Sequence, residues 1–288
     1  MEDQWALATQ AVCQAMAQHT QPFTAAIHRV VSHEYGEPCG TGSYLRLLGN
    51  VYLLTNDHVA RYVQQGGLSH QPRQDDYAHR IIHPFLSMPE PVDSAISRVD
   101  DESWNLATKS AIPASRIAPS HSTAQHELLF LQGYPGERSR WSALANGPIS
   151  RSVPYLTQEA TLPAGLDPRL YFALLYSPEH AKAVDNKGSH LPLPPGFSGT
   201  LVWNTNYVKC QGQDWQPDQS EATGLVALWG QNQYSDMIIA VRIEVVRMFL
   251  LQALRQEAAY FRWHDQGRPE GSAEADWYWA TQQIQELA

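Results

Sequence analysis

The chain has 288 residues and a mass of 32.3 kDa, enough for one large domain or two small ones around a sizeable core. Its formal net charge of −9 argues against a nucleic-acid or anionic-membrane partner. Three widely spaced cysteines (Cys13, Cys39 and Cys210) include no C-x-x-C pair, so we expect no structural zinc, no disulfides and a reducing interior. The N-terminus is acidic and no long apolar segment follows it, so a cytoplasmic protein is expected.

The first third of the chain predicts one helix followed by short strands. Residues 1–20 carry apolar side chains at spacings of three and four, which is typical of a helix, and Pro22 closes the segment. Gly49 and Asn50 predict a two-residue hairpin, and the polar residues 66–80 predict an exposed loop. Short apolar runs predict strands at residues 25–31, 43–48, 51–55, 81–85 and 93–99.

The rest of the chain predicts a second group of strands and then helices. A polar insertion at 204–221 is expected to be a surface loop, and helices are expected at 245–263 and 274–287. Many short strands without helices between them favour antiparallel barrels over a parallel sheet. The predicted strands cover residues 128–132, 149–154, 170–176, 199–203, 224–229 and 238–243.

Three polar residues stand at positions that suit acyl-transfer chemistry. Ser198 lies between Gly196 and Gly199 at the end of a proline-rich loop, where small neighbours leave its hydroxyl and the backbone N–H groups accessible. His58 follows an apolar strand, and Asp93 heads another strand. The order His58, Asp93, Ser198 is that of chymotrypsin and differs from the subtilisin and α/β-hydrolase orders.

Each of these residues also has an ordinary structural interpretation. A histidine at a strand end is usually a half-buried polar residue, a strand-heading aspartate is usually a turn residue, and a serine between glycines is common in turns. Asp100 and Asp101 are alternative partners for the histidine, and Asp57 is a more remote one. The ordered combination favours the catalytic interpretation.

Several short motifs in this order resemble the chymotrypsin-like (trypsin-like) serine protease superfamily, nearest in style to bacterial intracellular and Htr-type peptidase domains. The resemblance implies an all-β fold of two antiparallel six-stranded barrels, with an N-terminal helix, C-terminal helices and an active site between the barrels. It divides the chain into a helical extension (1–24), two barrels (25–118 and 119–244) and a helical segment (245–288). The motifs lie at residues 40–42, 58, 93–96, 131–136, 196–199, 224–226 and 229–230.

The resemblance implies a serine endopeptidase that needs no metal or cofactor. Ser198 would be the nucleophile, His58 the general base, and Asp93 the residue that orients the imidazole. The backbone N–H groups of Gly196 and Ser198 would form the oxyanion hole. A binding or regulatory module with the same fold and little or no turnover is the alternative. The strand expected to pair with substrate comprises Ala227, Leu228, Trp229 and Gly230.

Departures from the family pattern limit what can be expected of activation and specificity. Phe197 stands where activated digestive enzymes have an aspartate, which excludes activation by an ion pair with a freed N-terminus. Asp57 beside the histidine is expected to raise the imidazole pKa. Residues 191–195 and 231–236 would frame the primary specificity pocket. Asp236 would make this pocket select Arg or Lys in the substrate; alternatively, leucine and proline side chains would form its walls. The expected partners are a protein or peptide substrate and a regulatory protein, with no nucleic acid and no membrane. Residues 1–20 and 264–288 would dock on a barrel, mediate self-association or contact that regulatory partner.

Overall fold

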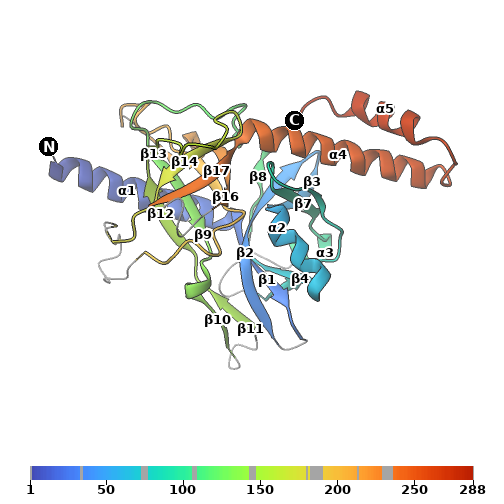
Figure 1. The fold of residues 1–288 in the computed structure, drawn as a ribbon, viewed down its shortest axis with the longest axis horizontal. Coiled ribbons are helices and arrows are strands. Elements are labelled where there is room, and N and C mark those ends of the chain that lie inside the picture. Colours follow the sequence, from blue (N-terminus) through green and yellow to red (C-terminus); the bar gives the residue numbers. More distant parts are fainter. Residues whose placement is uncertain are drawn as a thin grey trace.

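The computed structural model is mostly β-sheet, with helices at both ends of the chain (Figure 1). In the described residues the two large sheets hold eight and seven strands, almost all of them antiparallel. The antiparallel part of the expected fold is therefore confirmed, whereas two barrels of six strands each stays a prediction. The structure describes residues 2–32, 35–72, 77–105, 109–142, 147–179, 181, 191–212, 214–228 and 236–287.

The first sheet has the order β5-β4-β1-β2-β3-β7-β6, with β8 beside β2. Its β2–β3 hairpin turns at Leu48 and Gly49, one residue earlier than expected. Both turn residues have positive φ (50° and 84°), the conformation that a tight two-residue turn requires. The strands are β1 (Thr24–Val30), β2 (Gly36–Leu47), β3 (Asn50–Thr55), β4 (Leu68–Gln71), β5 (His79–Arg80), β6 (Leu86–Met88), β7 (Ser94–Arg98) and β8 (Ile112–Pro113).

Two expectations for this sheet are wrong. Residues 66–80 were expected to form an exposed loop, but they include the buried strand β4. Its polar side chains are buried because they have partners: Tyr44 Oη lies 2.6 Å from His70 Nδ1, and Gln71 Nε2 donates to the carbonyl of Pro148 (2.8 Å). The strand expected at residues 81–85 is absent from the structure, which has β5 before this segment and β6 after it.

The second sheet has the order β12-β9-β15-β16-β17-β14-β13, and β10 and β11 form a separate hairpin. The strand expected at 149–154 is in fact two strands, because β11 pairs with β10 and β12 pairs with β9. The strands are β9 (Leu129–Gly133), β10 (Ser139–Ser142), β11 (Gly147–Ser150), β12 (Val153–Thr157), β13 (Glu159–Ala160), β14 (Tyr171–Leu175), β15 (Leu201–Asn204), β16 (Glu221–Leu228) and β17 (Met237–Arg242).

The terminal helices share one apolar core with both sheets. Helix α1 (Glu2–Thr20) contributes Val12 and Met16 to this core, and α4 (Ile243–Asp265) contributes Phe249 and Leu250. Helix α4 contacts β16 and β17 of the second sheet and β6 and β7 of the first, and α5 (Ala273–Gln283) folds back along it (Figure 1). The expected helices are therefore present and bridge the two sheets. No described helix combines the length and apolarity that crossing a membrane demands.

Two buried histidines of the first sheet remain uncharged near neutral pH. Burial lowers the pKa of His28 to about 4, and its Nε2 lies 2.9 Å from Ser150 Oγ on the β10–β11 hairpin. Burial lowers the pKa of His70 to about 3, with smaller contributions from Lys109 and His79. Both imidazoles bind a proton more easily in the unfolded chain than in the folded one, because the histidine pKa in an unfolded chain is about 6.5.

The shared core predicts a large cost for truncating the buried face of α4. Leu250 is fully buried, so Leu250→Ala is expected to lower the free energy of unfolding by about 2–5 kcal/mol in a urea titration. Met248 lies two residues away and is 63% exposed, and Met248→Ala should change the free energy of unfolding by less than about 0.5 kcal/mol. Equal effects of the two variants would contradict this packing.

The buried histidines predict that the fold loses stability in mild acid. Between about pH 6.5 and 4 the unfolded chain binds a proton that native His28 does not, so the free energy of unfolding falls as the pH is lowered. The His28→Gln variant is expected to flatten this slope, by up to about 3 kcal/mol across the interval. Urea titrations at several pH values measure how the free energy of unfolding changes with pH. The His264→Gln variant, at an exposed position of α4, is the control. A His28→Gln slope as steep as the wild-type slope would refute the assignment.

Candidate active site

His58 stands in a single helical turn directly after β3. The strand ends at Thr55, and His58 belongs to α2 (Asp57–Ala60), whose N-cap is Asn56. Its Nδ1 lies 2.7 Å from Asp93 Oδ2, and its backbone N–H donates to Asp93 Oδ1 (3.1 Å). With Nδ1 bound to the carboxylate, Nε2 keeps its lone pair, and the imidazole is 44% exposed. The two hydrogen bonds therefore fix both the ring and its tautomer.

Asp93 is held rigidly just before β7. Its side chain is 4% exposed, and its backbone is in the left-handed region (φ 42°), which Asp tolerates better than most residues. Asn56 Nδ2 donates to its carbonyl oxygen (2.7 Å). Ser94 Oγ donates to the carbonyl of Val92 (3.0 Å), so this neighbouring hydroxyl is engaged with backbone rather than with the carboxylate. The carboxylate is left to bind His58.

The alternative aspartates have other roles. Asp57 forms an ion pair with Arg61, one helical turn away. Asp100 accepts a hydrogen bond from the backbone N–H of Ser103 (3.1 Å) and so begins the short helix α3 (Asp101–Asn105). Asp101 is exposed in the first turn of that helix. Only Asp93, among these aspartates, hydrogen-bonds to His58 in the described structure.

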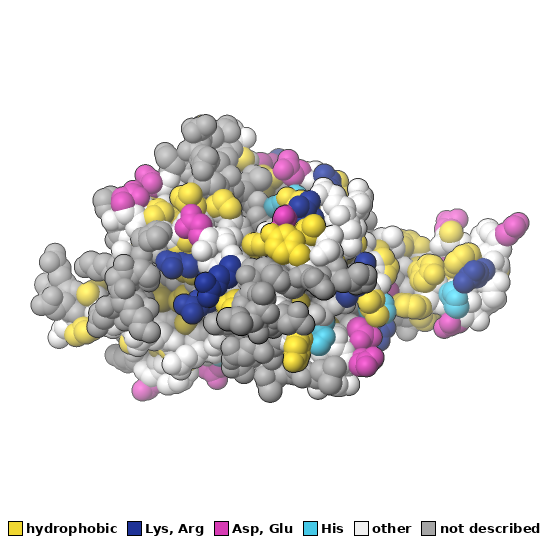
Figure 2. Space-filling view, turned by 90° about the horizontal axis from the view of Figure 1, so that it is seen from below, with side chains coloured by type: hydrophobic (Ala, Val, Ile, Leu, Met, Phe, Trp, Pro, Cys, Tyr) yellow, Lys and Arg dark blue, Asp and Glu magenta, His cyan; other side chains and the backbone are white. Residues whose placement is uncertain are grey.

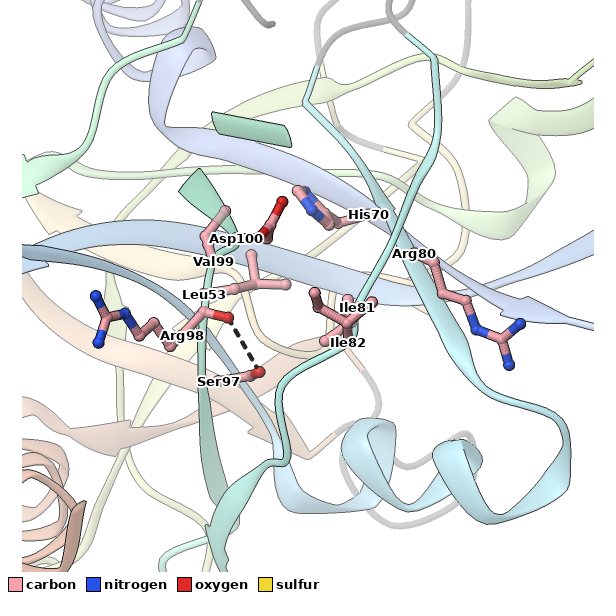
Figure 3. A pocket seen from close by; sticks show the side chains of 9 residues that line it. All are labelled: Leu53, His70, Arg80, Ile81, Ile82, Ser97, Arg98, Val99 and Asp100. Atoms are coloured by element: carbon pink, nitrogen blue, oxygen red, sulfur yellow. Dashed lines mark hydrogen bonds between the residues drawn. The ribbon is translucent and has the colours of Figure 1, made fainter. Parts of the chain in front are cut away.

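Asp100 also lines a small pocket of the first sheet (Figure 3). Its volume of about 10 Å³ corresponds to roughly one water molecule, too little for a substrate group. In Figure 3 the pocket is surrounded by Leu53, Ile81 and the strand that carries Ser97, whose hydroxyl donates to the carbonyl of Arg98 (3.4 Å). This pocket is therefore not a candidate substrate site.

Ser198 lies at the tip of a compact loop that is anchored by its neighbour. The Phe197 ring is completely buried and packs edge-on against Tyr176, with ring centroids 6.0 Å apart. The Phe197 N–H donates to the carbonyl of Pro194 (2.8 Å), and the Thr200 N–H donates to the carbonyl of Phe197 (2.9 Å). With Phe197 turned into the core, Ser198 next to it stays half-buried at the surface.

The Ser198 loop also rests against β2, which pairs with the strand that ends before His58. Thr41 of β2 donates its backbone N–H to the carbonyl of Ser198 (2.9 Å) and its hydroxyl to the carbonyl of Gly196 (2.7 Å). A Cβ atom on Gly40 would lie 2.8 Å from the side chain of Val59, which follows His58, and 3.4 Å from the carbonyl oxygen of Ser198. The structure thus joins His58 to Asp93 directly, and brings the backbone of Ser198 beside the same helical turn.

Within the described residues, the N–H groups expected to form an oxyanion hole have no acceptor. In the described structure no group accepts a hydrogen bond from the N–H of Gly196 or of Ser198. Gly196 has φ +102°, and a Cβ atom there would lie 2.5 Å from the carbonyl oxygen of Tyr134, so only glycine fits. Unused N–H groups two residues apart are able to bind a developing negative charge.

The expected substrate strand is described only in part. Ala227 is buried at an irregularity of the β16–β17 pairing, and Leu228 is the last residue of β16. Trp229 and Gly230 lie outside the described residues, as do residues 231–235 of the expected pocket frame. Asp236 is exposed, and its carbonyl accepts a hydrogen bond from the N–H of Tyr176 (2.8 Å).

A groove of about 350 Å³ opens next to Gly196. Cys39 lines it, but burial raises the pKa of this thiol to about 12, so it is protonated at neutral pH and is a poor nucleophile. In the part of the chain that the structure describes, no group of three or more His, Cys, Asp or Glu residues is placed to hold a metal ion.

Two residues that shape the site were missed in the sequence. Thr41 lies inside the motif at residues 40–42 and Asn56 lies two residues before His58, but the bonds they make reach residues 155 and 37 positions away. The one local sequence signal for either residue is the preference of Asn for the position that begins a helix, and this signal applies to Asn56 alone.

Comparisons with known proteins find a family model for the end of the chain and distant likenesses among solved structures. Residues 256–286, from the end of α4 through α5, match the family model "Protein of unknown function (DUF2934)". No curated protein matches the chain.

Among solved structures, two of Rv3671c from M. tuberculosis are 16% identical, with TM-scores of 0.47. The inactive serine-to-alanine mutant is aligned over 83% of this chain and 90% of its own, and the active form of the protease over 82% of each. A structure from work on the Sesbania mosaic virus VPg protein is 14% identical, with a TM-score of 0.45 over 81% of this chain and 91% of its own. At such distances the function is inferred below from the geometry of this chain alone.

The loop packing predicts that Gly199 cannot be replaced. A Cβ atom there would lie 2.1 Å from the carbonyl oxygen of Thr41, and φ is +85°. The Gly199→Ala variant is expected to lose about 1–2 kcal/mol for the backbone conformation, and about 1–3 kcal/mol more for the clash. Urea titrations measure the loss. Gly165 has a similar φ (+95°) but open space around it, so Gly165→Ala should show only the first cost; equal losses in the two variants would contradict the packing.

Proposed function

We propose that this chain is a serine endopeptidase of the trypsin-like superfamily, with His58, Asp93 and Ser198 as its catalytic triad. The observation that carries the proposal is the pair of hydrogen bonds from His58 to the buried carboxylate of Asp93. A merely structural histidine at a strand end has no need of a buried carboxylate on its Nδ1 side and a free, exposed Nε2. The Ser198 loop, held against the adjacent strands by Thr41, supports the same conclusion.

The proposed reaction begins with Ser198. Its Oγ attacks the carbonyl carbon of a peptide bond while His58 Nε2 accepts the hydroxyl proton. Asp93 accepts the Nδ1–H hydrogen bond and stabilises the imidazolium that forms. The carbonyl oxygen becomes negative and binds the N–H groups of Gly196 and Ser198.

The imidazolium then gives its proton to the leaving amine, and the C–N bond breaks, which leaves an acyl-enzyme on Ser198. Water attacks the ester with His58 again as base, and the serine is released with its proton. Every step uses groups of this chain and water alone, so the proposed mechanism calls for no metal or organic cofactor.

The finer features of the family belong to the same proposal. Residues 25–118 and 119–244 would form the two six-stranded barrels, between the helical segments 1–24 and 245–288. The strand from Ala227 through Gly230 would pair with the part of the substrate before the cleaved bond. Likeness to bacterial intracellular and Htr-type domains in particular stays a prediction.

The proposal predicts that a fluorophosphonate probe labels Ser198. We expect wild-type protein to be labelled and to cleave a fluorescent protein substrate. Ser198→Ala should abolish labelling, and Asp93→Asn should slow cleavage on the order of 10⁴-fold because the histidine loses its orienting partner. In-gel fluorescence and peptide-release assays measure the two effects.

Matched controls separate these effects from general disturbance. Ser120 and Asp101 are exposed, so Ser120→Ala and Asp101→Asn should label and cleave like wild type. If folded wild-type protein is never labelled, the endopeptidase proposal fails and a binding module with this fold remains. Inactivation by Asp101→Asn with an active Asp93→Asn variant would overturn the assignment of the triad.

A further inference from the structure

The groove beside Gly196 is lined in part by residues that precede Ser198 in its loop. One wall holds Cys39 and Tyr62, and the other holds Gly136, Pro195 and Gly196. Gly136 belongs to the short helix η4 (Gly136–Arg138), and its N–H donates to the carbonyl of Pro195 (3.0 Å). The groove therefore begins at the N-terminal end of the Ser198 loop.

The opposite end of that loop is attached to β16. The N–H of Gly199 donates to the carbonyl of Val226 (3.1 Å), next to Ala227, where the proposed substrate strand starts. A substrate lying across the loop would place its residues before the cleaved bond along β16. The residues after the cleaved bond would then enter the groove beside Gly196.

Three arginines lie at the base of the β10–β11 hairpin, which follows the groove residue Gly136 directly in the chain. We call Arg138, Arg140 and Arg151 the arginine patch. Arg138 ends η4, Arg140 belongs to β10, and the N–H of Arg151 donates to the carbonyl of Arg138 (3.1 Å). Helix η4 and both strands of the hairpin contact β2, which carries Cys39.

The strand register places Arg140 on the outer face of the hairpin. Ser139 pairs with Ser150, and the Ser150 hydroxyl lies 2.9 Å from His28 Nε2 of β1, so that face is turned toward the first sheet. Side chains alternate along a strand, so Arg140 of β10 points the other way. Arg140 and Arg151 are exposed, and Figure 2, seen from the end that carries β10 and β11, shows Lys and Arg side chains gathered together there.

The positive charge of this patch is unusual in so acidic a chain. The whole protein has 20 Lys and Arg against 29 Asp and Glu, yet Glu137 is the one acidic residue among residues 136–152. Within the described structure no carboxylate pairs with Arg140 or Arg151. Arg29 inside the groove, by contrast, is already paired with Glu37. In the described structure Arg140 and Arg151 therefore carry guanidinium charges that no carboxylate compensates.

We propose that the arginine patch binds acidic side chains of the protein substrate that follow the cleaved bond. The inference rests on the proposed function, which supplies the direction of the substrate. Guanidinium groups bind carboxylates in a planar, bidentate geometry, so Asp and Glu are the residues that such a patch selects. A run of acidic residues would engage several of these arginines together.

The binding test uses the Ser198→Ala protein, so that no turnover is required. Two fluorescent peptides share one sequence, except that one carries a run of glutamates where the other carries glutamines. Fluorescence anisotropy should show the glutamate peptide binding more tightly. Replacing Arg140 and Arg151 together by glutamine should weaken its binding roughly tenfold, since each exposed charge pair contributes little alone.

Two control variants locate the effect. The Arg140→Lys, Arg151→Lys double variant keeps the charge and should retain the preference at least in part. Arg169→Gln removes another exposed arginine, which is paired with Asp167 elsewhere on the surface, and should change nothing. Equal binding of the two peptides, or a glutamine double variant that binds like its parent, would overturn the inference. Tighter binding of a single-stranded oligonucleotide, lost in the same double variant, would also overturn it.

A cleavage arm separates this inference from the proposed function. In wild-type protein the glutamate run is placed after a sequence that the enzyme cuts, and we expect faster cleavage than with glutamines. If the fluorophosphonate never labels the protein but the glutamate peptide still binds more tightly, the peptidase proposal is refuted and the proposed binding of acidic residues stands. If labelling and cleavage are normal but glutamates give no preference, the proposed binding of acidic residues by the arginine patch is refuted and the peptidase proposal stands.

Discussion

The candidate site depends on the four hydrogen bonds of one threonine. The Thr41 hydroxyl donates to the carbonyl of Gly196 (2.7 Å) and accepts from the N–H of Tyr134 (2.9 Å). Its backbone N–H donates to the carbonyl of Ser198 (2.9 Å), and its carbonyl accepts from the Thr55 hydroxyl (2.8 Å). Thr41, Thr55 and Tyr134 are buried, and an unmade bond of a buried group costs about 1–3 kcal/mol. One buried residue of the first sheet therefore fixes the serine loop of the second.

This arrangement joins the two halves of the proposed chemistry. Thr55 is the last residue of β3, three positions before His58, so Thr41 is bonded to the histidine-bearing strand and to the serine loop together. The close approach demands glycine: a Cβ atom on Gly199 would lie 2.4 Å from the Thr55 hydroxyl, and one on Gly133 would lie 2.4 Å from that of Thr200. The glycines that mark the loop in the sequence are thus required by packing as much as by the turn.

The sequence predicted those parts of the molecule whose cause is local. The strand before His58, the serine turn and the terminal helices follow from apolar spacing and turn residues, and the structure has all of them. The buried strand around His70 was missed because its polar side chains find partners on distant strands. The sequence also gives no sign of the hydrogen bonds of Thr41 or of the clustering of the arginine patch. Both depend on strand register and packing, which bring separate residues together. The triad itself stays a prediction, supported by the contact between His58 and Asp93.

The rate at which a fluorophosphonate labels Ser198 in Thr41 variants tests this account most directly. Thr41→Val keeps the shape of the side chain but removes the hydroxyl that orients the loop, whereas Thr41→Ser keeps the hydroxyl. For variants that circular dichroism shows to be folded, we expect Thr41→Val to be labelled at least about tenfold more slowly than wild type, because small misplacements of a reacting group are costly. Thr41→Ser should stay near the wild-type rate. A folded Thr41→Val protein that is labelled as fast as wild type, or a wild-type protein that is never labelled, would contradict the account.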